Sequence, residues 1–390
     1  EKMGADDYRF PGGKSSLFYT LMRGIAPRLA RLNDGFCFTS ALAVACTLVS
    51  QHCAGPGIGG GTIPRLFLSL IAQTGRGKDA PTKYAAALLE EAFPGQCDPA
   101  TGECGPSPRL LNRGGFATTA ALVDALKVSP EFAKLQVVPE GSSFFSGRGP
   151  AVDKHRVSAE SSLLQLWDGK GDIASQSSKA SGAGKQVRSS VINILLASNE
   201  SLLARVLDRG SSSSGLSARF LWIFVDDDAE KVQERGGPLI FDEFGNLLAE
   251  RDRSSEREAE ILWSNAVAAV RKFIEEGDAF AANVRRSGHR VGIDPDNTFG
   301  TIQLDFQTPE VVLANHQLKE WCASIGGDDD EACIAQDLFV RVPQQALRLA
   351  TIFARCRGKR HIDPADYRLA ARFAMQSAHG AFVLAAERLD

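Results

Sequence analysis

The sequence predicts an α/β protein with a mostly parallel sheet, and three observations lead to this prediction. Short apolar runs typical of buried strands recur before residue 235, separated by stretches with helical spacing or loop composition. A glycine-rich turn stands between one of these runs and a helix. From about residue 254 the chain changes to long amphipathic helices. We therefore expect an N-terminal helical segment over 1–60, an α/β core over 61–235 and a mainly helical region over 236–390.

The individual elements follow from hydrophobic spacing and from turn signals. Strands are expected over 66–71, 135–138, 191–197 and 219–225. Helices are expected over 15–32, 39–49, 82–93, 118–126, 161–167, 254–276, 308–324, 343–355 and 363–385. The last helix has a clear start, because Asp363 can cap an N–H group and Pro364 presets the backbone angle φ. Segments 94–115 and 169–190 have loop compositions.

Composition narrows the class of protein. Of 390 residues, 44% are hydrophobic and 23% are charged, and the net charge of −3 provides no overall basic field for nucleic acid. The eight cysteines form no C-x-x-C pair, which favours reduced thiols over a metal or disulfide role. We see neither a signal peptide nor an apolar run of about 18 residues, so we expect a cytoplasmic protein without a membrane span. The first residue is not Met, which is consistent with a fragment of a longer protein.

A phosphate-binding loop is the sharpest chemical signal in the sequence. Residues Ala72–Asp79 read AQTGRGKD and stand between an apolar run and a helix. Glycines permit the tight turn, the helix N-terminus favours anions, and the lysine can reach the β- and γ-phosphates. This pattern predicts a P-loop NTPase that binds ATP and Mg²⁺. The expected nucleotide-binding residues are Thr74, Gly75, Arg76, Gly77, Lys78 and Asp79.

The loop departs from the usual pattern at two positions. Ala72 replaces the first glycine, and Asp79 replaces the Ser or Thr that normally contacts Mg²⁺. We take Asp79 as the metal ligand, acting directly or through water, although its charge opposes the phosphates. Two other stretches, PGGKSS at 11–16 and SGAGKQ at 181–186, contain similar letters but follow no buried strand.

Hydrolysis also needs an acid that orients the attacking water. Glu140, directly after the run LQVV, is preferred over Glu243, whose segment also fits a β-hairpin. Pro139 stands where an Asp that holds Mg²⁺ would be expected. Asn199 follows a strand and can sense the γ-phosphate or simply cap the strand. Arg219 can act as an arginine finger across a subunit interface, or form an ordinary salt bridge.

A basic loop is the main candidate for contact with DNA. It combines basic side chains with glycine and serine, a composition that suits phosphate contacts without sequence readout, or a plain solvated loop. Weaker basic clusters lie at 285–290 and 355–361. The candidate DNA-binding residues of the loop are Lys170, Lys179, Lys185 and Arg188.

Several stretches together resemble a known group of proteins. They are SALAVACTLVSQ, LIAQTGRGKDAP, LQVVPEGSSFF with LLQLWDGKG, INILLASNE with GLSARFLWIF, and VPQQALRLATIFAR with HIDPADYRLAARFA. Over roughly residues 35–385 the chain resembles the RecA-like P-loop ATPases of phages, plasmids and integrated elements. Those proteins often carry, or sit beside, a primase-polymerase domain and are regarded as replicative helicases.

The resemblance implies specific roles and partners. Lys78 would bind phosphate, Glu140 would occupy the acidic position, and Arg219 would fall in the family's G…RFL stretch. Pro139 departs from the family, which usually has Asp there, and this departure puts efficient hydrolysis in doubt. The implied partners are single-stranded or forked DNA, further copies of the chain in a homo-oligomer that can be a hexamer, and a primase domain or protein.

Three functions are therefore compared. The leading one is an ATP-dependent DNA motor, the helicase part of a primase-helicase of a mobile element. A nucleotide-binding, DNA-associated scaffold with little or no hydrolysis is the alternative that Asp79 and Pro139 favour. A small-molecule kinase would need a lid with clustered arginines, and segment 94–115 supplies only Arg109 and Arg113.

Overall fold

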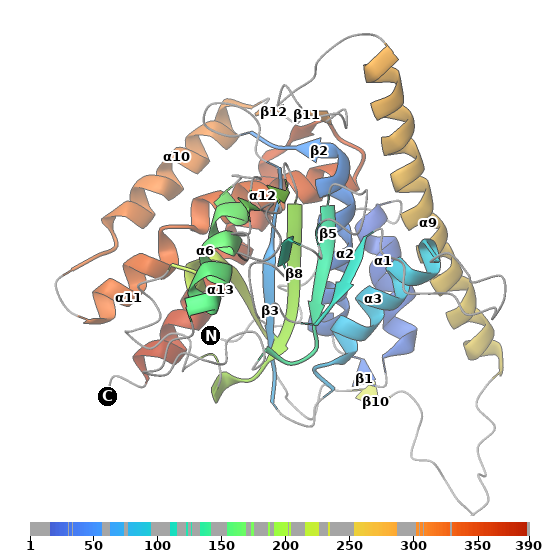
Figure 1. The fold of residues 1–390 in the computed structure, drawn as a ribbon, viewed down its shortest axis with the longest axis horizontal. Coiled ribbons are helices and arrows are strands. Elements are labelled where there is room, and N and C mark those ends of the chain that lie inside the picture. The colour runs from blue at the N-terminus through green and yellow to red at the C-terminus, as the bar shows by residue number, and fades with distance from the viewer. Residues whose placement is uncertain are drawn as a thin grey trace, which may run out of the picture.

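The structure is a computed structural model of the chain. It describes residues 16–29, 31–32, 34–56, 63–73, 77–94, 110–114, 122–123, 126, 133–141, 154–168, 173–174, 186–187, 191–201, 203, 215–225, 233–234, 253–286, 302–303, 305–306, 308–327 and 330–387. The fold is α/β and mostly helical, with a five-stranded sheet at its centre (Figure 1).

All five strands of the central sheet run parallel. Strands β3, β8 and β9 are buried along their whole length, which explains why they read as continuous apolar runs rather than as alternating patterns. The prediction of a mostly parallel sheet is confirmed. In spatial order, the strands are β4 (Leu111–Arg113), β5 (Ala133–Val138), β8 (Val191–Ser198), β3 (Phe67–Ile71) and β9 (Phe220–Phe224).

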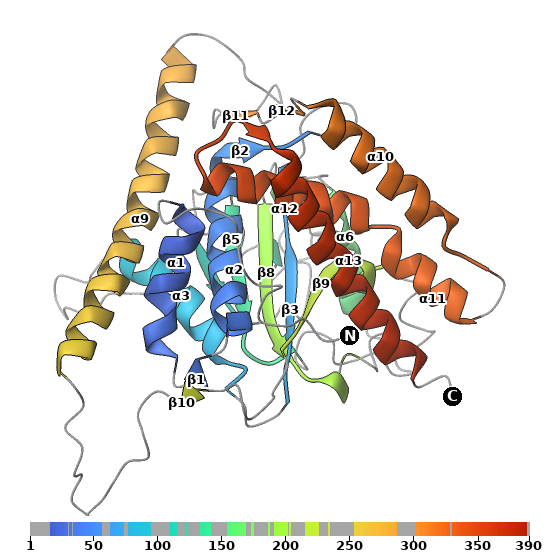
Figure 2. The same ribbon diagram turned by 180° about the vertical axis from the view of Figure 1, so that it is seen from behind.

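Helices cover both faces of this sheet. Figures 1 and 2 show α2, α12 and α13 on one face and α6 on the other, while α1 and α9 lie along one flank and α10 and α11 along the opposite one. The helices are α1 (Leu17–Ile25), α2 (Asp34–His52), α3 (Ala80–Ala92), α6 (Lys154–Asp168), α9 (Arg253–Arg286), α10 (Pro309–Ser324), α11 (Asp330–Phe339), α12 (Val342–Cys356) and α13 (Pro364–Ala386).

Short strands and turns complete the described part of the chain. The pairs β1–β10 and β6–β7 are antiparallel, and the pairs β2–β11 and β12–β13 are parallel. Their bounds, with two 3₁₀ turns, are β1 (Arg31–Leu32), β2 (Cys53–Ala54), β6 (Ile173–Ala174), β7 (Gln186–Val187), β10 (Gln233–Glu234), β11 (Ile302–Gln303), β12 (Asp305–Phe306), β13 (His361–Ile362), η2 (Ala26–Arg28) and η3 (Ser217–Arg219).

Residues from all three expected segments contribute to one hydrophobic core. Phe18 and Phe38 of the N-terminal segment contact Phe353 and Phe373 of the C-terminal helices, with ring centroids 5.0–6.1 Å apart. Strand β9 packs on α13, where Ser377 Oγ accepts the Trp222 N–H at 2.6 Å. The C-terminal helices are therefore bound directly to the sheet. The segment boundaries at residues 60 and 235 stay predictions.

One helix in the described part of the chain is long and apolar enough to cross a membrane. The window is Gly35–His52 in α2, with a mean hydropathy of 1.2, and all of it is buried inside the structure. The core helix of a folded domain meets the same criteria, and α2 occupies that place between the sheet and α1.

Gly277 allows the long helix α9 to lie close to α2. A Cβ atom at position 277 would lie 2.7 Å from Cγ of the buried His52 ring. Alanine gains roughly 1 kcal/mol of helix propensity over glycine, but overpacking costs about 1–3 kcal/mol. We expect Gly277→Ala to lower the free energy of unfolding by up to about 2 kcal/mol, measured from the urea midpoint.

Gly326→Ala is the control for this prediction, because a Cβ there meets no described atom nearer than 3.6 Å. A Gly277→Ala protein that is more stable than the unchanged chain would show that propensity outweighs the contact with His52.

Candidate nucleotide site

The predicted phosphate loop lies at a strand–turn–helix corner, as its sequence indicated. Strand β3 is buried and ends at Ile71, and helix α3 begins at Ala80 with Pro81 in its first turn. Gly77 has φ +78°, a left-handed conformation that favours glycine, and its carbonyl accepts the Ala80 N–H at 2.9 Å. The remaining loop residues Thr74, Gly75 and Arg76 lie outside the described residues.

Lys78 and Asp79 form the end of this turn. The Lys78 side chain is half-buried and that of Asp79 is exposed. Asp79 takes the N-cap position of α3, and its backbone oxygen accepts the Lys83 N–H at 3.0 Å and the Thr82 hydroxyl at 2.7 Å. Its carboxylate makes no capping hydrogen bond. A cationic and an anionic side chain thus stand together at the positive end of a helix dipole.

The chain leaves two neighbouring strands of the sheet in opposite directions next to this corner. From β3 the chain crosses towards β4 at one edge of the sheet, whereas from β8 it crosses in the opposite direction to β9. Ligands of open α/β sheets bind outside the carboxyl ends of strands where the connections diverge in this way. In this sheet the divergence falls between β3 and β8, where Ile71 pairs with Ser198.

Polar groups end β8 at the same place. The Ser198 carbonyl accepts the Ala72 N–H at 3.2 Å, which fixes the start of the loop against β8. The Ser198 hydroxyl is buried and has no hydrogen-bond partner within the described residues. Asn199 follows it and is half-buried, and its backbone oxygen accepts the Leu203 N–H at 3.1 Å. The sequence placed both polar residues at this strand end and favoured Asn199, and the structure shows that the buried Ser198 hydroxyl is also available.

Glu140 reaches this edge of the sheet from β5. It is exposed, and the next residue, Gly141, lies so close to β8 that a Cβ would be 3.0 Å from the Ala197 carbonyl oxygen. Glu140 therefore stands beside the end of β8, on the far side of that strand from β3. The competing acid, Glu243, lies outside the described residues.

Within the chain, Arg219 does not lie with Lys78, Asn199 and Glu140 at the carboxyl edge of the sheet. It directly precedes β9 and so lies at the amino ends of the parallel strands, opposite Lys78. Its side chain is 7% exposed and pairs with Asp168, Nη2 to Oδ2 at 2.8 Å. Within the chain this contact is a salt bridge, and the role of Arg219 as an arginine finger stays a prediction.

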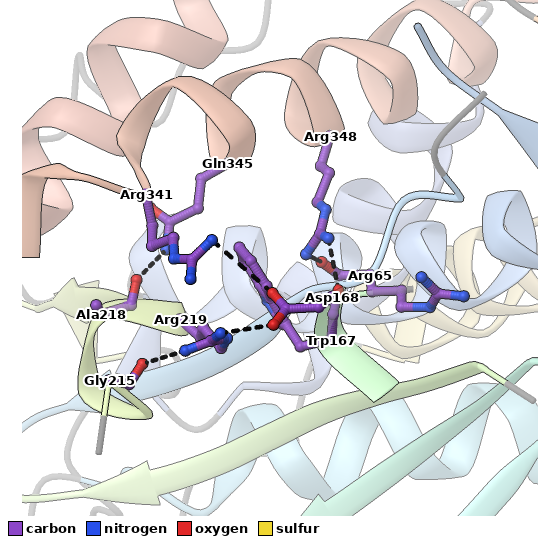
Figure 3. Close-up of polar contacts among 9 residues, drawn as sticks. All are labelled: Arg65, Trp167, Asp168, Gly215, Ala218, Arg219, Arg341, Gln345 and Arg348. Atoms are coloured by element: carbon purple, nitrogen blue, oxygen red, sulfur yellow. Dashed lines mark hydrogen bonds and ion pairs between the residues drawn. The ribbon is translucent and has the colours of Figure 1, made fainter. Parts of the chain in front are cut away.

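The amino edge holds a cluster that sequence reasoning missed (Figure 3). We call it the arginine cluster, and Trp167, which is fully buried, lies at its centre. Three arginines place their guanidinium carbon over this ring. The distance from that carbon to the ring centroid is 3.7 Å for Arg348, 5.3 Å for Arg219 and 5.6 Å for Arg341. The cluster comprises Arg65, Trp167, Asp168, Arg219, Arg341 and Arg348.

Helix α12 provides one side of the arginine cluster. Arg348 donates from Nη1 to the Arg65 carbonyl at 3.1 Å and from Nη2 to the Trp167 carbonyl at 2.6 Å. Gln345 donates to the carbonyls of Ala218 and Phe220, which fixes the start of β9. The residues Arg341, Gln345 and Arg348 are spaced i, i+4 and i+7. That line of polar residues at helical spacing, in a helix with many apolar residues, was the available sequence signal.

Burial and mutual repulsion act on these guanidinium groups. Burial lowers the pKa of Arg65 to about 10, against the attraction of Asp168. Burial, and then the nearby charge of Arg65, hold the pKa of Arg348 well below its usual range. The pKa of Arg341 is also lowered, first by burial and then by Arg219. Burial in all three cases, and neighbouring positive charge for Arg341 and Arg348, therefore disfavour the charged form of these guanidinium groups.

Of the basic regions proposed to contact DNA, the structure describes the cluster at 355–361 but not the candidate residues of the loop. Lys170, Lys179, Lys185 and Arg188 lie outside the described residues. The cluster at 355–361 is partly neutralised, because Arg357 and Lys359 pair with Asp363, and Arg357 also pairs with Asp366. Asp363 therefore makes ion pairs instead of the expected capping bond at the start of α13. These contacts favour a structural turn at 355–361.

The described residues contain no group of three or more His, Cys, Asp or Glu side chains placed to hold a metal ion. Mg²⁺ that accompanies a nucleotide is usually held by phosphates and water with one or two protein carboxylates. The exposed carboxylate of Asp79 fits that limited role. It would hold Mg²⁺ at the start of α3, next to Lys78.

Neither a scan against models of protein families nor a search of curated proteins finds a match to this chain.

Proposed function

We propose that the chain is a RecA-like P-loop ATPase that drives movement on DNA, as the helicase part of a primase-helicase of a mobile genetic element. The observation that carries the proposal is the Gly77–Lys78 turn. It joins the buried parallel strand β3 to the N-terminus of α3, beside the point where the chain connections diverge. Strand, glycine turn, lysine and helix dipole are the parts that a phosphate-binding loop requires.

The residues at this edge divide the work of ATP hydrolysis. Lys78 would bind the β- and γ-phosphates, with the first N–H groups of α3. Glu140, exposed at the edge, would orient and deprotonate the attacking water. Ser198 and Asn199 would contact the γ-phosphate from the end of β8. Mg²⁺, held by Asp79 directly or through water, would supply charge neutralisation at the phosphates.

The remaining parts of the proposal rest on the resemblance and on charge. The resemblance supports action on single-stranded or forked DNA, assembly into a homo-oligomer such as a hexamer, and a primase domain or protein as partner. The basic residues between 169 and 190 suit contact with the DNA backbone. A cytoplasmic location agrees with these partners.

A second function is favoured by one feature of the site. Pro139, exposed beside Glu140, supplies no carboxylate for Mg²⁺, and Asp79 places a negative charge where phosphates would bind. Both residues would slow ATP hydrolysis. They therefore favour a scaffold protein that binds nucleotide and DNA but hydrolyses ATP slowly.

ATP hydrolysis separates the two functions. We expect turnover by the purified chain to rise with single-stranded DNA. Glu140→Gln should lower kcat by about a hundredfold or more while ATP still binds, because a general base contributes roughly 10²–10⁴ in rate. Glu331→Gln, an exposed glutamate on α11, is the matched control and should hydrolyse normally.

The other outcomes also discriminate. Normal turnover in Glu140→Gln, with loss in Lys78→Ala, would move the acid to Glu243 and contradict its assignment to Glu140. Tight ATP binding without turnover in the unchanged chain would support the scaffold and contradict the motor.

A further inference from the structure

The arginine cluster contains more positive charge than its surroundings balance. Asp168 is the one carboxylate within ion-pair distance of any of its arginines in the described part of the chain. Arg219 and Arg341 share that carboxylate, at 2.8 Å and 3.8 Å. Arg65 is 4% exposed, and its buried Nε has no hydrogen-bond acceptor among the described residues. Buried charges without partners are unfavourable, so this arrangement calls for a further anion.

Additional donors in the arginine cluster are also unused. The buried Nε atoms of Arg65, Arg219 and Arg348 have no acceptor among the described residues. Arg219 is otherwise held in place, because its Nη1 donates to the Gly215 carbonyl at 2.7 Å. Arg348 is fixed by two backbone carbonyls. These guanidinium groups are therefore held in position before any ligand arrives, which reduces the side-chain conformational entropy that is lost on binding.

Asp168 marks where an anion can enter. Its side chain and that of Arg341 are each 34% exposed, in contrast to the buried remainder of the cluster. Its two carboxylate oxygens face different arginines, with Oδ2 towards Arg219 and Oδ1 towards Arg341 (Figure 3). Phosphate oxygens can bridge two arginines in the same way, and a phosphate group brings more negative charge than a carboxylate.

We propose that Arg219 and Arg341 bind a phosphate group at the amino edge of the sheet, in place of the Asp168 carboxylate, while Arg65 and Arg348 provide buried positive charge behind it. The site lies at the opposite end of the strands from Lys78 and does not depend on the proposed ATPase function. The phosphate group can be free or part of a nucleic-acid backbone, since both present the same oxygens.

Binding of inorganic phosphate to the full chain carrying Lys78→Ala tests this proposal, because that background removes the other candidate phosphate site. In low-salt buffer, titration calorimetry should detect saturable binding of one phosphate per chain. Arg341→Gln should weaken binding at least tenfold. Asp168→Asn should tighten binding severalfold, because it removes the competing carboxylate. Arg368→Gln, an exposed arginine on α13, is the control and should change nothing.

The opposite responses of the Asp168 and Arg341 variants distinguish a ligand site from a purely structural ion pair. Absence of saturable binding, or equal affinity in the unchanged and Arg341→Gln chains, would overturn the proposal. So would weaker binding by a folded Asp168→Asn chain. If Asp168→Asn does not fold, Arg341→Lys replaces it, because it keeps the charge but loses the fork and should still weaken binding.

A short oligothymidylate identifies the source of the phosphate group. Competition between the oligonucleotide and inorganic phosphate would assign the site to a nucleic-acid backbone. Phosphate binding without such competition would assign it to a free phosphate group. Either result supports the site, and ATP binding by the chain without Lys78→Ala is measured separately, so failure of one proposal leaves the other testable.

Discussion

Replacement of Lys78 by alanine is expected to weaken ATP binding by about a hundredfold. Lys78 stands at the N-terminus of α3, after a glycine turn that leaves the side chain half-buried. A hydrogen bond to a charged group contributes about 1.5–3 kcal/mol, which corresponds to roughly 10- to 150-fold in affinity. Turnover should fall further, since the same charge stabilises the transferred phosphoryl group. Nucleotide affinity is measured by fluorescence titration and turnover by phosphate release.

Lys83→Ala is the matched control, because Lys83 lies in the same helix and is exposed. Its loss should leave ATP affinity unchanged. The free energy of unfolding of the Lys78→Ala chain, measured with urea, should lie within about 0.5 kcal/mol of that of the unchanged chain, as for most substitutions away from the core. ATP affinity that is equal in the unchanged and Lys78→Ala chains would remove the basis of the ATPase proposal.

Local patterns predicted most of the fold. The apolar runs at 66–71, 135–138, 191–197 and 219–225 correspond to β3, β5, β8 and β9 within two residues. Continuous burial of these strands makes the signal strong. Helix α9 extends ten residues beyond its predicted end at 276, because Gly277 belongs to the helix and packs against α2.

Other elements were missed or misjudged for identifiable reasons. Strand β4 reads LNR, is three residues long and lies at the edge of the sheet within a segment predicted as loop. Helix α11 was not predicted, and α6 begins at Lys154 rather than 161. Helix α1 ends at Ile25 instead of continuing to 32, because Pro27 has no N–H group to continue the helical hydrogen bonds, and the chain turns through η2 instead.

The two sites differ in how far the sequence could reveal them. The loop around Lys78 is a local motif, so strand, turn and helix could be placed from adjacent residues. Glu140 required only the end of one strand. In contrast, Arg65, Arg219 and Arg348 are far apart in the sequence. Only the strand order and the packing of α12 bring Arg219 and Arg348 to Trp167, and Arg348 to the Arg65 carbonyl. Long-range juxtaposition of this kind has no local signature.

Trp167 should be among the residues that contribute most to stability, and its replacement by alanine should cost about 3–5 kcal/mol. A buried tryptophan removed to alanine loses its transfer free energy and leaves a cavity. Here the ring also stacks on Arg348, with 3.7 Å between the ring centroid and the guanidinium carbon. A cation–π contact that is shielded from water contributes up to about 2 kcal/mol. We therefore expect a large fall in the urea midpoint for Trp167→Ala, at an unchanged slope.

Trp167→Phe separates the contribution of an aromatic face from that of the indole N–H group and the additional volume. The Nε1–H of Trp167 is buried and has no acceptor among the described residues, so its removal relieves an unpaired donor. Phenylalanine also keeps an aromatic face for Arg348. We expect Trp167→Phe to cost about 1–2 kcal/mol, well below the alanine variant, because only part of the volume is lost. Equal losses for both variants would show that the aromatic face kept by phenylalanine contributes nothing, which would contradict the role of the contact with Arg348. A cost below 1 kcal/mol for Trp167→Ala would mean that repulsion among Arg65, Arg341 and Arg348 cancels what the ring contributes.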